Sequence, residues 1–172
     1  MRRNNTASDL AGFGYPFYVD YAKPIEKLIL EGGYAKIDEI FSLELEAFKE
    51  YGGKKRTEAE GFLKHFGSCV FPDYKEFLKN LNESNLRPAD IRELLCFGSS
   101  YRHIQRQFDV VAMGSINNSG YHLQAPELSS SNMLIERTLD IFMFKDEEYG
   151  FCCSENILPL KGQNRFLVLS KN

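Results

Sequence analysis

The sequence predicts a single α+β domain over residues 1–172, with about five helices in a helical first half packed on a C-terminal antiparallel sheet of four to five strands. Apolar residues recur at helical spacing as far as Gly98, and from Gln107 onward they alternate with polar residues. A chain of 172 residues that is 43% hydrophobic and 13% aromatic is long and apolar enough to bury one core. No helix-length segment separates the predicted strands, so we expect antiparallel pairing.

The first element expected is an irregular arm over residues 1–20, which is polar at first and then rich in aromatic residues and glycine. The helical part follows over residues 21–98. Its first helix is predicted between Pro24, which suits a first turn, and the pair Gly32-Gly33, which ends a helix. A longer amphipathic helix is expected over residues 37–51, because apolar side chains mark one face of it.

Three further helices are predicted before the sheet. The segment Thr57-Glu58-Ala59-Glu60 reads as a capping box, in which a hydroxyl and a carboxylate each accept from a free amide, and it should open a helix that stops at Gly67. Pro72-Asp73 begins the next helix. Pro88 starts the last one, with Asp90 in its first turn complementing the helix dipole and Gly98 closing it.

The antiparallel sheet is expected over residues 107–170. Its first strand runs over residues 107–113, and Asn117-Asn118-Ser119-Gly120 is a turn that leads into the next strand. The strongest strand pattern covers residues 134–144. A turn over residues 145–148 brings the chain back, and the final strand spans Arg165–Ser170.

The charge and composition of the chain limit the classes of partner that we expect it to bind. A net charge of −3 argues against nucleic acid as the main partner, because phosphate binding needs a basic face. The run Lys54-Lys55-Arg56 after two glycines is typical of a solvated turn. No apolar stretch reaches the length of a membrane helix and no signal peptide is evident, so we expect no membrane association and a cytoplasmic location.

The histidines and cysteines are sparse, and we expect no metal and no cofactor. His65, His103 and His122 lie far apart, and none of them has the i, i+4 spacing of a helical metal site. A composite of His103, His122 and Cys152 in three dimensions is left open. The cysteines lack CxxC spacing and are read as free core thiols.

The junction between the two halves, residues 99–107, collects basic and aromatic side chains with no evident core role. Junction loops often present functional groups on a rigid scaffold. The candidate catalytic residues, for the case that the chain is an enzyme, are His103, His122, Arg102 and Arg106. The candidate binding residues are Tyr101, Asp140, Glu147 and Glu148.

Residues 62–82 resemble the opening of the SUKH superfamily. In that pattern a short helix and a glycine precede an apolar-Pro-Asp-Tyr-Lys-x-Phe-Leu helix that ends near an asparagine, here Phe71 to Leu78 and Asn82. The usual Asn-Gly is Asn82-Glu83 in this chain. Many SUKH proteins are bacterial immunity proteins, so the resemblance implies stoichiometric binding of a toxin without catalysis.

Three functions are compatible with the sequence. The first is a non-catalytic protein-binding module, such as an immunity or inhibitor protein that neutralises a toxin or effector and uses acidic groups to steer onto a basic partner. The second is a small hydrolase or transferase with its site at the helix–sheet junction. The third is a viral or phage accessory protein that assembles through a sheet edge. The oligomeric state is open.

Overall fold

The computed structural model describes residues 13–36, 56–65, 70–71, 74–118, 122–143, 149–152 and 165–171. Four helices lie in these ranges: α2 (Ile25–Gly32), α4 (Tyr74–Glu83), α5 (Ile91–Ser100) and α6 (Arg102–Gln105). The strands of the described residues are β1 (Tyr15–Asp20), β2 (Ala35–Lys36), β3 (Arg56–Lys64), β4 (Val70–Phe71), β5 (Leu86–Pro88), β6 (Val110–Val111), β7 (Asn117–Asn118), β8 (His122–Leu128), β9 (Met133–Met143), β10 (Tyr149–Cys152) and β11 (Arg165–Ser170).

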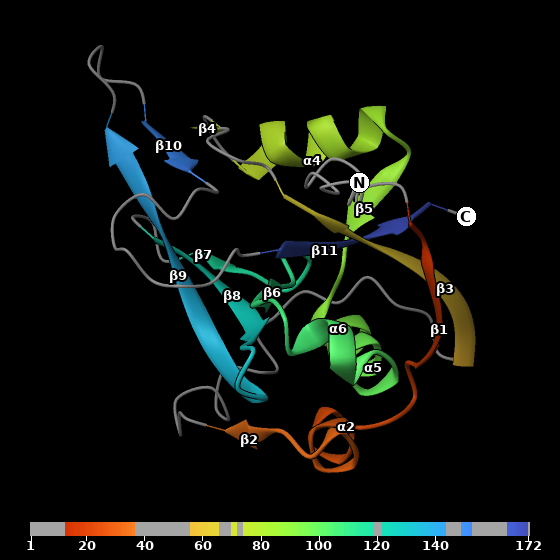
Figure 1. The fold of residues 1–172 in the computed structure, drawn as a ribbon. Helices are drawn as coiled ribbons and strands as arrows, with labels where there is room; N and C mark the ends of the chain where they lie inside the picture. Colours follow the sequence, from red (N-terminus) through yellow and green to blue (C-terminus); the bar gives the residue numbers. More distant parts are fainter. Residues whose placement is uncertain are drawn as a thin grey trace, which may run out of the picture.

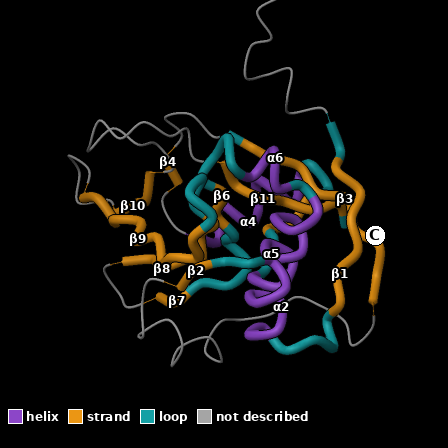
Figure 2. Tube along the Cα trace, turned by 60° about the horizontal axis from the view of Figure 1, so that its bottom comes forward, coloured by secondary structure: helices purple, strands orange, loops and turns teal. Residues whose placement is uncertain are grey.

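These strands form one mixed sheet in the order β1-β3-β11-β6-β8-β9-β10-β4, with β2 on β9, β5 on β11 and β7 on β8. Most neighbours are antiparallel, but β11 runs parallel to β6 and β2 runs parallel to β9. Figure 2 shows β1 and β3 at one end of the sheet and β10 and β4 at the other. The last strand in the chain therefore lies in the middle of the sheet.

Helices cover both faces of the sheet around β11. Figure 1 shows α4 on one side of this strand, and α5 and α6 on the other. Phe166 and Val168 belong to a core cluster with Phe77 of α4, whereas Leu167 and Leu169 belong to the cluster that includes the α5 side chains. Successive side chains of a strand point to opposite faces, so an uninterrupted apolar strand fits a sheet that is buried on both sides.

The helix ends follow signals in the sequence. Helix α2 begins after Pro24 and ends at Gly33, whose φ of 65° is the left-handed conformation that glycine adopts without strain. Helix α5 begins at a capping box in which the Asp90 carboxylate accepts from the Glu93 amide, and the Glu93 carboxylate accepts from the Asp90 amide. The predictions of α2 and α4 are confirmed. Pro88, expected to start the last helix, is instead the last residue of β5, and Asp90 is the N-cap that precedes α5.

The predicted fold class is wrong in its proportions. The described part of the first hundred residues holds strands as well as helices, and its helices do not make a helical half. The sheet is larger than the four to five strands expected and its pairing is mixed. The irregular arm expected over residues 1–20 contains β1, and the first strand expected over residues 107–113 is reduced to β6.

The helix expected from the capping-box pattern at Thr57 is instead β3. Burial along this strand has a period of two: Ala59, Gly61 and Leu63 are buried, while their neighbours are half-buried or exposed. Thr57 and Glu60 are both exposed, and the extended backbone places their side chains on opposite faces of the strand, so the pattern does not cap a helix. Gly98, expected to end the last helix, lies inside α5, where the Tyr34 ring and Leu128 pack against it.

Outside the described residues lie the predicted helix over residues 37–51 and the predicted turn over residues 145–148. Within the described ranges, no helix has both the length and the apolar content needed to cross a membrane.

Candidate binding site beside strand β1

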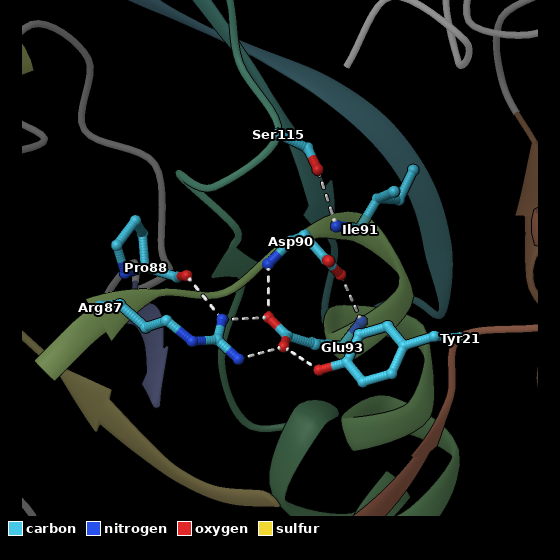
Figure 3. Close-up of polar contacts among 7 residues, drawn as sticks. All are labelled: Tyr21, Arg87, Pro88, Asp90, Ile91, Glu93 and Ser115. Atoms are coloured by element: carbon cyan, nitrogen blue, oxygen red, sulfur yellow. Dashed lines mark hydrogen bonds and ion pairs between the residues drawn. The ribbon is translucent and has the colours of Figure 1, made fainter. Parts of the chain in front are cut away.

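A buried polar cluster, the Glu93 cluster (Tyr21, Arg87, Asp90, Glu93 and Ser115), joins the segment after β1 to β5, α5 and the loop after β6 (Figure 3). The Glu93 side chain is fully buried. Its carboxylate accepts two hydrogen bonds from the Arg87 guanidinium (2.6 and 2.9 Å), one from the Asp90 amide (2.8 Å) and one from the Tyr21 hydroxyl. The Ser115 hydroxyl accepts from the Ile91 amide (2.9 Å).

The Glu93 cluster is structural. A buried carboxylate is tolerated only when its charge is paired and its oxygens are hydrogen-bonded, and both conditions hold here. Burial and the negative charge of Glu93 raise the pKa of Tyr21 well above its usual range, so the phenol stays protonated and donates. The cluster fixes the chain immediately after β1 against the start of α5.

The outer edge of β1 carries backbone groups that turn away from β3. Among the described residues, β1 pairs with β3 alone. Pro16 has no amide hydrogen to offer β3, and its carbonyl accepts from the Tyr101 hydroxyl (2.6 Å). The orientation of backbone groups alternates along an antiparallel strand, so Tyr18 and Asp20 should also turn their N–H and C=O outward.

The contacts of Asp20 support this orientation. Its amide donates toward the Cys96 thiol of α5, and its carbonyl accepts from the Lys23 amide (3.2 Å). Both flanking outward positions, Pro16 and Asp20, therefore have partners within the chain. Between them lies Tyr18, for whose outward N–H and C=O the described part of the chain supplies no partner.

A pocket of about 220 Å³ adjoins this edge. We call it the β1 pocket. Its described lining comes from four parts of the chain, namely β1, the turn and helix that follow it, the first residue of β3, and α5: Tyr18, Asp20, Lys23, Leu28, Glu31, Arg56, Cys96, Ser99 and Ser100. The volume is sufficient for one side chain of a bound segment and too small for a large cofactor.

Charges of both signs surround the β1 pocket. The Arg56 guanidinium lies over the Tyr18 ring, 4.8 Å from its centroid, an arrangement that favours a cation on an aromatic face. Lys23 is paired with Glu31 at 2.8 Å, and this hydrogen bond raises the pKa of the Lys23 ammonium. The lining therefore offers charged side chains to a ligand group of either charge.

Cys96 is unsuited to nucleophilic chemistry. The thiol is 7% exposed. Burial raises its pKa, an effect that the Asp20 amide only partly offsets, so the thiol form dominates near neutral pH. A reactive cysteine requires the opposite, a thiolate-favouring and accessible setting. Cys96 therefore supplies no nucleophile to the β1 pocket.

The structure places the junction residues on α6 and its start. Tyr101 is half-buried, packs against Phe97 and Tyr15, and donates to the edge of β1. Arg102 donates to the Gly32 carbonyl (2.8 Å) at the end of α2. His103 and Arg106 are exposed. Two of the four junction candidates thus have contacts that hold elements together.

The backbone does not bring α6 close to the start of β8. Gln105 of α6 donates to the carbonyl of Ser129, just after β8 ends at Leu128. His122 is the first residue of the same strand, about 20 Å away along it at the usual rise per residue. Asp140 of β9 is the cross-strand partner of His122.

For the remaining candidates, Cys152, Glu147 and Glu148, the structure gives only a position in the fold or no description. Cys152 ends β10, which is separated from β6 by β8 and β9 in the sheet order. Glu147 and Glu148 lie outside the described residues. Within the described ranges, no three His, Cys, Asp or Glu side chains are grouped so that they could hold a metal ion.

Sequence reasoning missed Tyr18, Arg56 and Glu93. A signal for Tyr18 was present: Pro16 within an apolar-aromatic run is typical of an edge strand, because proline cannot donate to a neighbour. The run Lys54-Lys55-Arg56 predicts a solvated turn, but Arg56 begins β3. Asp90 and Glu93 have the spacing of a capping box, but no local pattern marks Glu93 as buried, since its other partners, Tyr21 and Arg87, belong to other elements.

Comparison with known protein families, curated proteins and solved structures finds no match to this chain.

Proposed function

We propose that this chain is a non-catalytic protein-binding module that takes an extended segment of a partner protein beside β1. The observation that carries the proposal is the β1 pocket beside an edge strand in which the contacts of Pro16 and Asp20 indicate that the N–H and C=O of Tyr18 point outward. In recognition by strand addition, main-chain hydrogen bonds provide affinity and neighbouring pockets provide side-chain specificity. Both parts are present at this edge.

The edge admits only a short contact. The carbonyl of Pro16 already accepts from the Tyr101 hydroxyl. The carbonyl of Asp20 accepts from the Lys23 amide, and the amide of Asp20 donates toward the Cys96 thiol. One residue of the partner can pair with Tyr18, and the segment must then turn away. Two hydrogen bonds contribute about 1–3 kcal/mol in total, so the side chain that enters the β1 pocket has to provide much of the remaining affinity.

The SUKH resemblance of residues 62–82 supports a more specific form of this function, neutralisation of a toxin by stoichiometric binding. The residues of the motif that the structure describes most fully form α4, which buries Phe77 and Leu81 against the sheet. A partner recovered with this chain should then inhibit growth when it is expressed alone. Co-expression of the wild-type chain should relieve the inhibition, and co-expression of a binding-deficient variant should not.

The decisive variant is Tyr18→Pro. Proline removes the outward amide hydrogen of Tyr18, and because that amide points away from β3, the ladder between the two strands is retained. We expect Tyr18→Pro to weaken the binding of peptides selected on the wild-type protein about tenfold, since a partner carbonyl left unpaired costs about 1–3 kcal/mol. Tyr18→Ala, which keeps the amide, separates the backbone contribution from that of the ring.

A matched control tests the register itself. The amide of Val19 should point toward β3, so Val19→Pro should unfold the protein or lower its Tm strongly, whereas Tyr18→Pro should not. The proposal is wrong if the selected peptides bind Tyr18→Pro and the wild type equally well.

Hydrogen exchange examines the same group without a partner. In the free protein the Tyr18 amide should exchange much faster than the amides of Phe17 and Val19, although all three belong to β1. Binding of a selected peptide should slow the exchange of the Tyr18 amide. Equal protection of the three amides in the free protein would show that the outward edge is not open.

A further inference from the structure

A second pocket, which we call the α4 pocket, lies between α4, β5 and the end of β11. Its volume is about 390 Å³. Its apolar lining is Leu78, Leu86 and Pro88, of which Leu86 and Pro88 are buried. Three apolar side chains suffice to receive one aliphatic or aromatic side chain, and they are too few to enclose a long acyl chain.

All the charged residues that line the α4 pocket in the described part of the chain are cations: Lys79, Arg87 and Lys171. Arg87 is neutralised from the interior by Glu93. Lys79 lies 3.4 Å from Glu76 across an exposed pair, a contact that contributes little in water. Lys171 donates to the neutral side chain of Asn82, so no carboxylate offsets its charge in that contact.

Lys171 is held in place. Its backbone amide donates to the Asn85 carbonyl (3.0 Å), and its own carbonyl accepts from the Asn85 side chain (3.4 Å). Asn85 adopts a positive φ of 55°, a conformation that asparagine tolerates better than most residues. These contacts fix the backbone of Lys171 at the rim of the pocket, and the hydrogen bond to Asn82 orients its ammonium group, which then loses less entropy on meeting an anion than a free lysine would.

We infer that the α4 pocket binds an acidic protein segment that carries an aliphatic or aromatic residue next to its carboxylates. The apolar side chain would occupy the space between Leu78, Leu86 and Pro88, and the carboxylates would meet Lys79 and Lys171. The whole chain carries a net charge of −3, so general attraction does not favour an acidic ligand. Binding of such a ligand therefore has to arise from the local grouping of cations.

The test titrates ¹⁵N-labelled full-length protein with a capped peptide Glu-Glu-Leu-Phe-Glu-Glu and, in parallel, with Lys-Lys-Leu-Phe-Lys-Lys. We expect the acidic peptide to shift the amide resonances of Lys79, Asn82, Leu86 and Lys171, and the shifts to shrink at high salt. The basic peptide should leave these resonances unchanged. Equal shifts with both peptides, or shifts confined to other residues, would overturn the inference.

Matched variants locate the charge effect. The double variant Lys79→Glu/Lys171→Glu should weaken binding of the acidic peptide at least tenfold, whereas Lys75→Glu, on the same helix and outside the lining, should change it less than twofold. Tyr18→Pro should have no effect, which separates this site from the one beside β1. A Lys75→Glu effect as large as that of the double variant, or displacement of the peptide by decanoate at equal concentration, would refute a built site for an acidic segment.

Discussion

The carboxylate of Glu93 shows how one residue organises several elements. It receives hydrogen bonds from Tyr21, Arg87 and Asp90, which belong to the segment after β1, to β5 and to the start of α5. The position of the β1 pocket depends on this arrangement, because Tyr21 follows the edge strand directly and α5 supplies one wall. Arg87 also lines the α4 pocket, so the two pockets share a support.

Removal of the buried charge should be costly. Glu93→Gln leaves the Arg87 guanidinium, whose side chain is 22% exposed, without its ionic partner. We expect the free energy of unfolding, measured in urea, to fall by about 3 kcal/mol or more. Tyr21→Phe removes one hydrogen bond to the carboxylate and should lower it by about 1–2 kcal/mol.

Glu83→Gln provides the control for this prediction. Glu83 is exposed at the end of α4, so its substitution should change the free energy of unfolding by less than about 0.5 kcal/mol. If Glu93→Gln has an equally small effect, the cluster does not contribute to stability.

At the scale of the elements, α2 depends on a side chain from the distant helix α6. The last carbonyls of a helix have no partner within it, and here the Arg102 guanidinium donates to those of Gly32 (2.8 Å) and Glu31 (3.4 Å). Tyr34 follows α2 and donates to the Leu95 carbonyl of α5 (3.1 Å). These contacts connect the wall of the β1 pocket to the rest of the fold.

A pair of arginine variants distinguishes capping from surface charge. Arg102→Ala should lower the Tm by about 2–4 °C and speed hydrogen exchange at the end of α2, because a cation and its hydrogen bonds are lost from the helix C-terminus. Arg106→Ala, at the exposed residue that ends α6, should leave both quantities near the wild-type values. Equal effects of the two substitutions would remove the capping role of Arg102.

The sequence predicted elements best where both ends carry local signals. Pro24 and Gly33 bound α2, and the apolar run over residues 165–170 forms β11, whereas α5 begins after Pro88 and continues past Gly98. Strand β3 was missed because its threonine and glutamates match a helix cap. The β1 site was missed because it depends on backbone groups of an edge strand that face away from the neighbouring strand. The spacing of residues along the chain does not show which strand lies at the edge of the sheet.

At the scale of the whole molecule, stability should depend on alkaline pH through buried tyrosines. Burial raises the pKa of Tyr34 to about 12, above the value of about 10 for an unfolded chain. The folded state then binds more protons than the unfolded state between these values. Stability is therefore fully present below pH 10 and is lost as the pH rises through 12.

Tyr34→Phe tests this dependence. The variant lacks the ionisable phenol, so its free energy of unfolding should fall less steeply between pH 10 and 12, by a difference that approaches about 3 kcal/mol at the upper end. Tyr21, whose pKa is also raised by burial, should account for part of the slope that remains. Identical slopes for Tyr34→Phe and the wild type would contradict the prediction.

The central place of β11 has a consequence for the order in which the protein can be made. Strand β11 bridges β3 on one side and β6 and β5 on the other, and its side chains enter both core clusters. During synthesis, the earlier strands and helices are all made before residues 165–170. The two cores therefore stay incompletely closed until residues 165–170 have been made and can pair, and folding then depends on contacts between residues far apart in the chain.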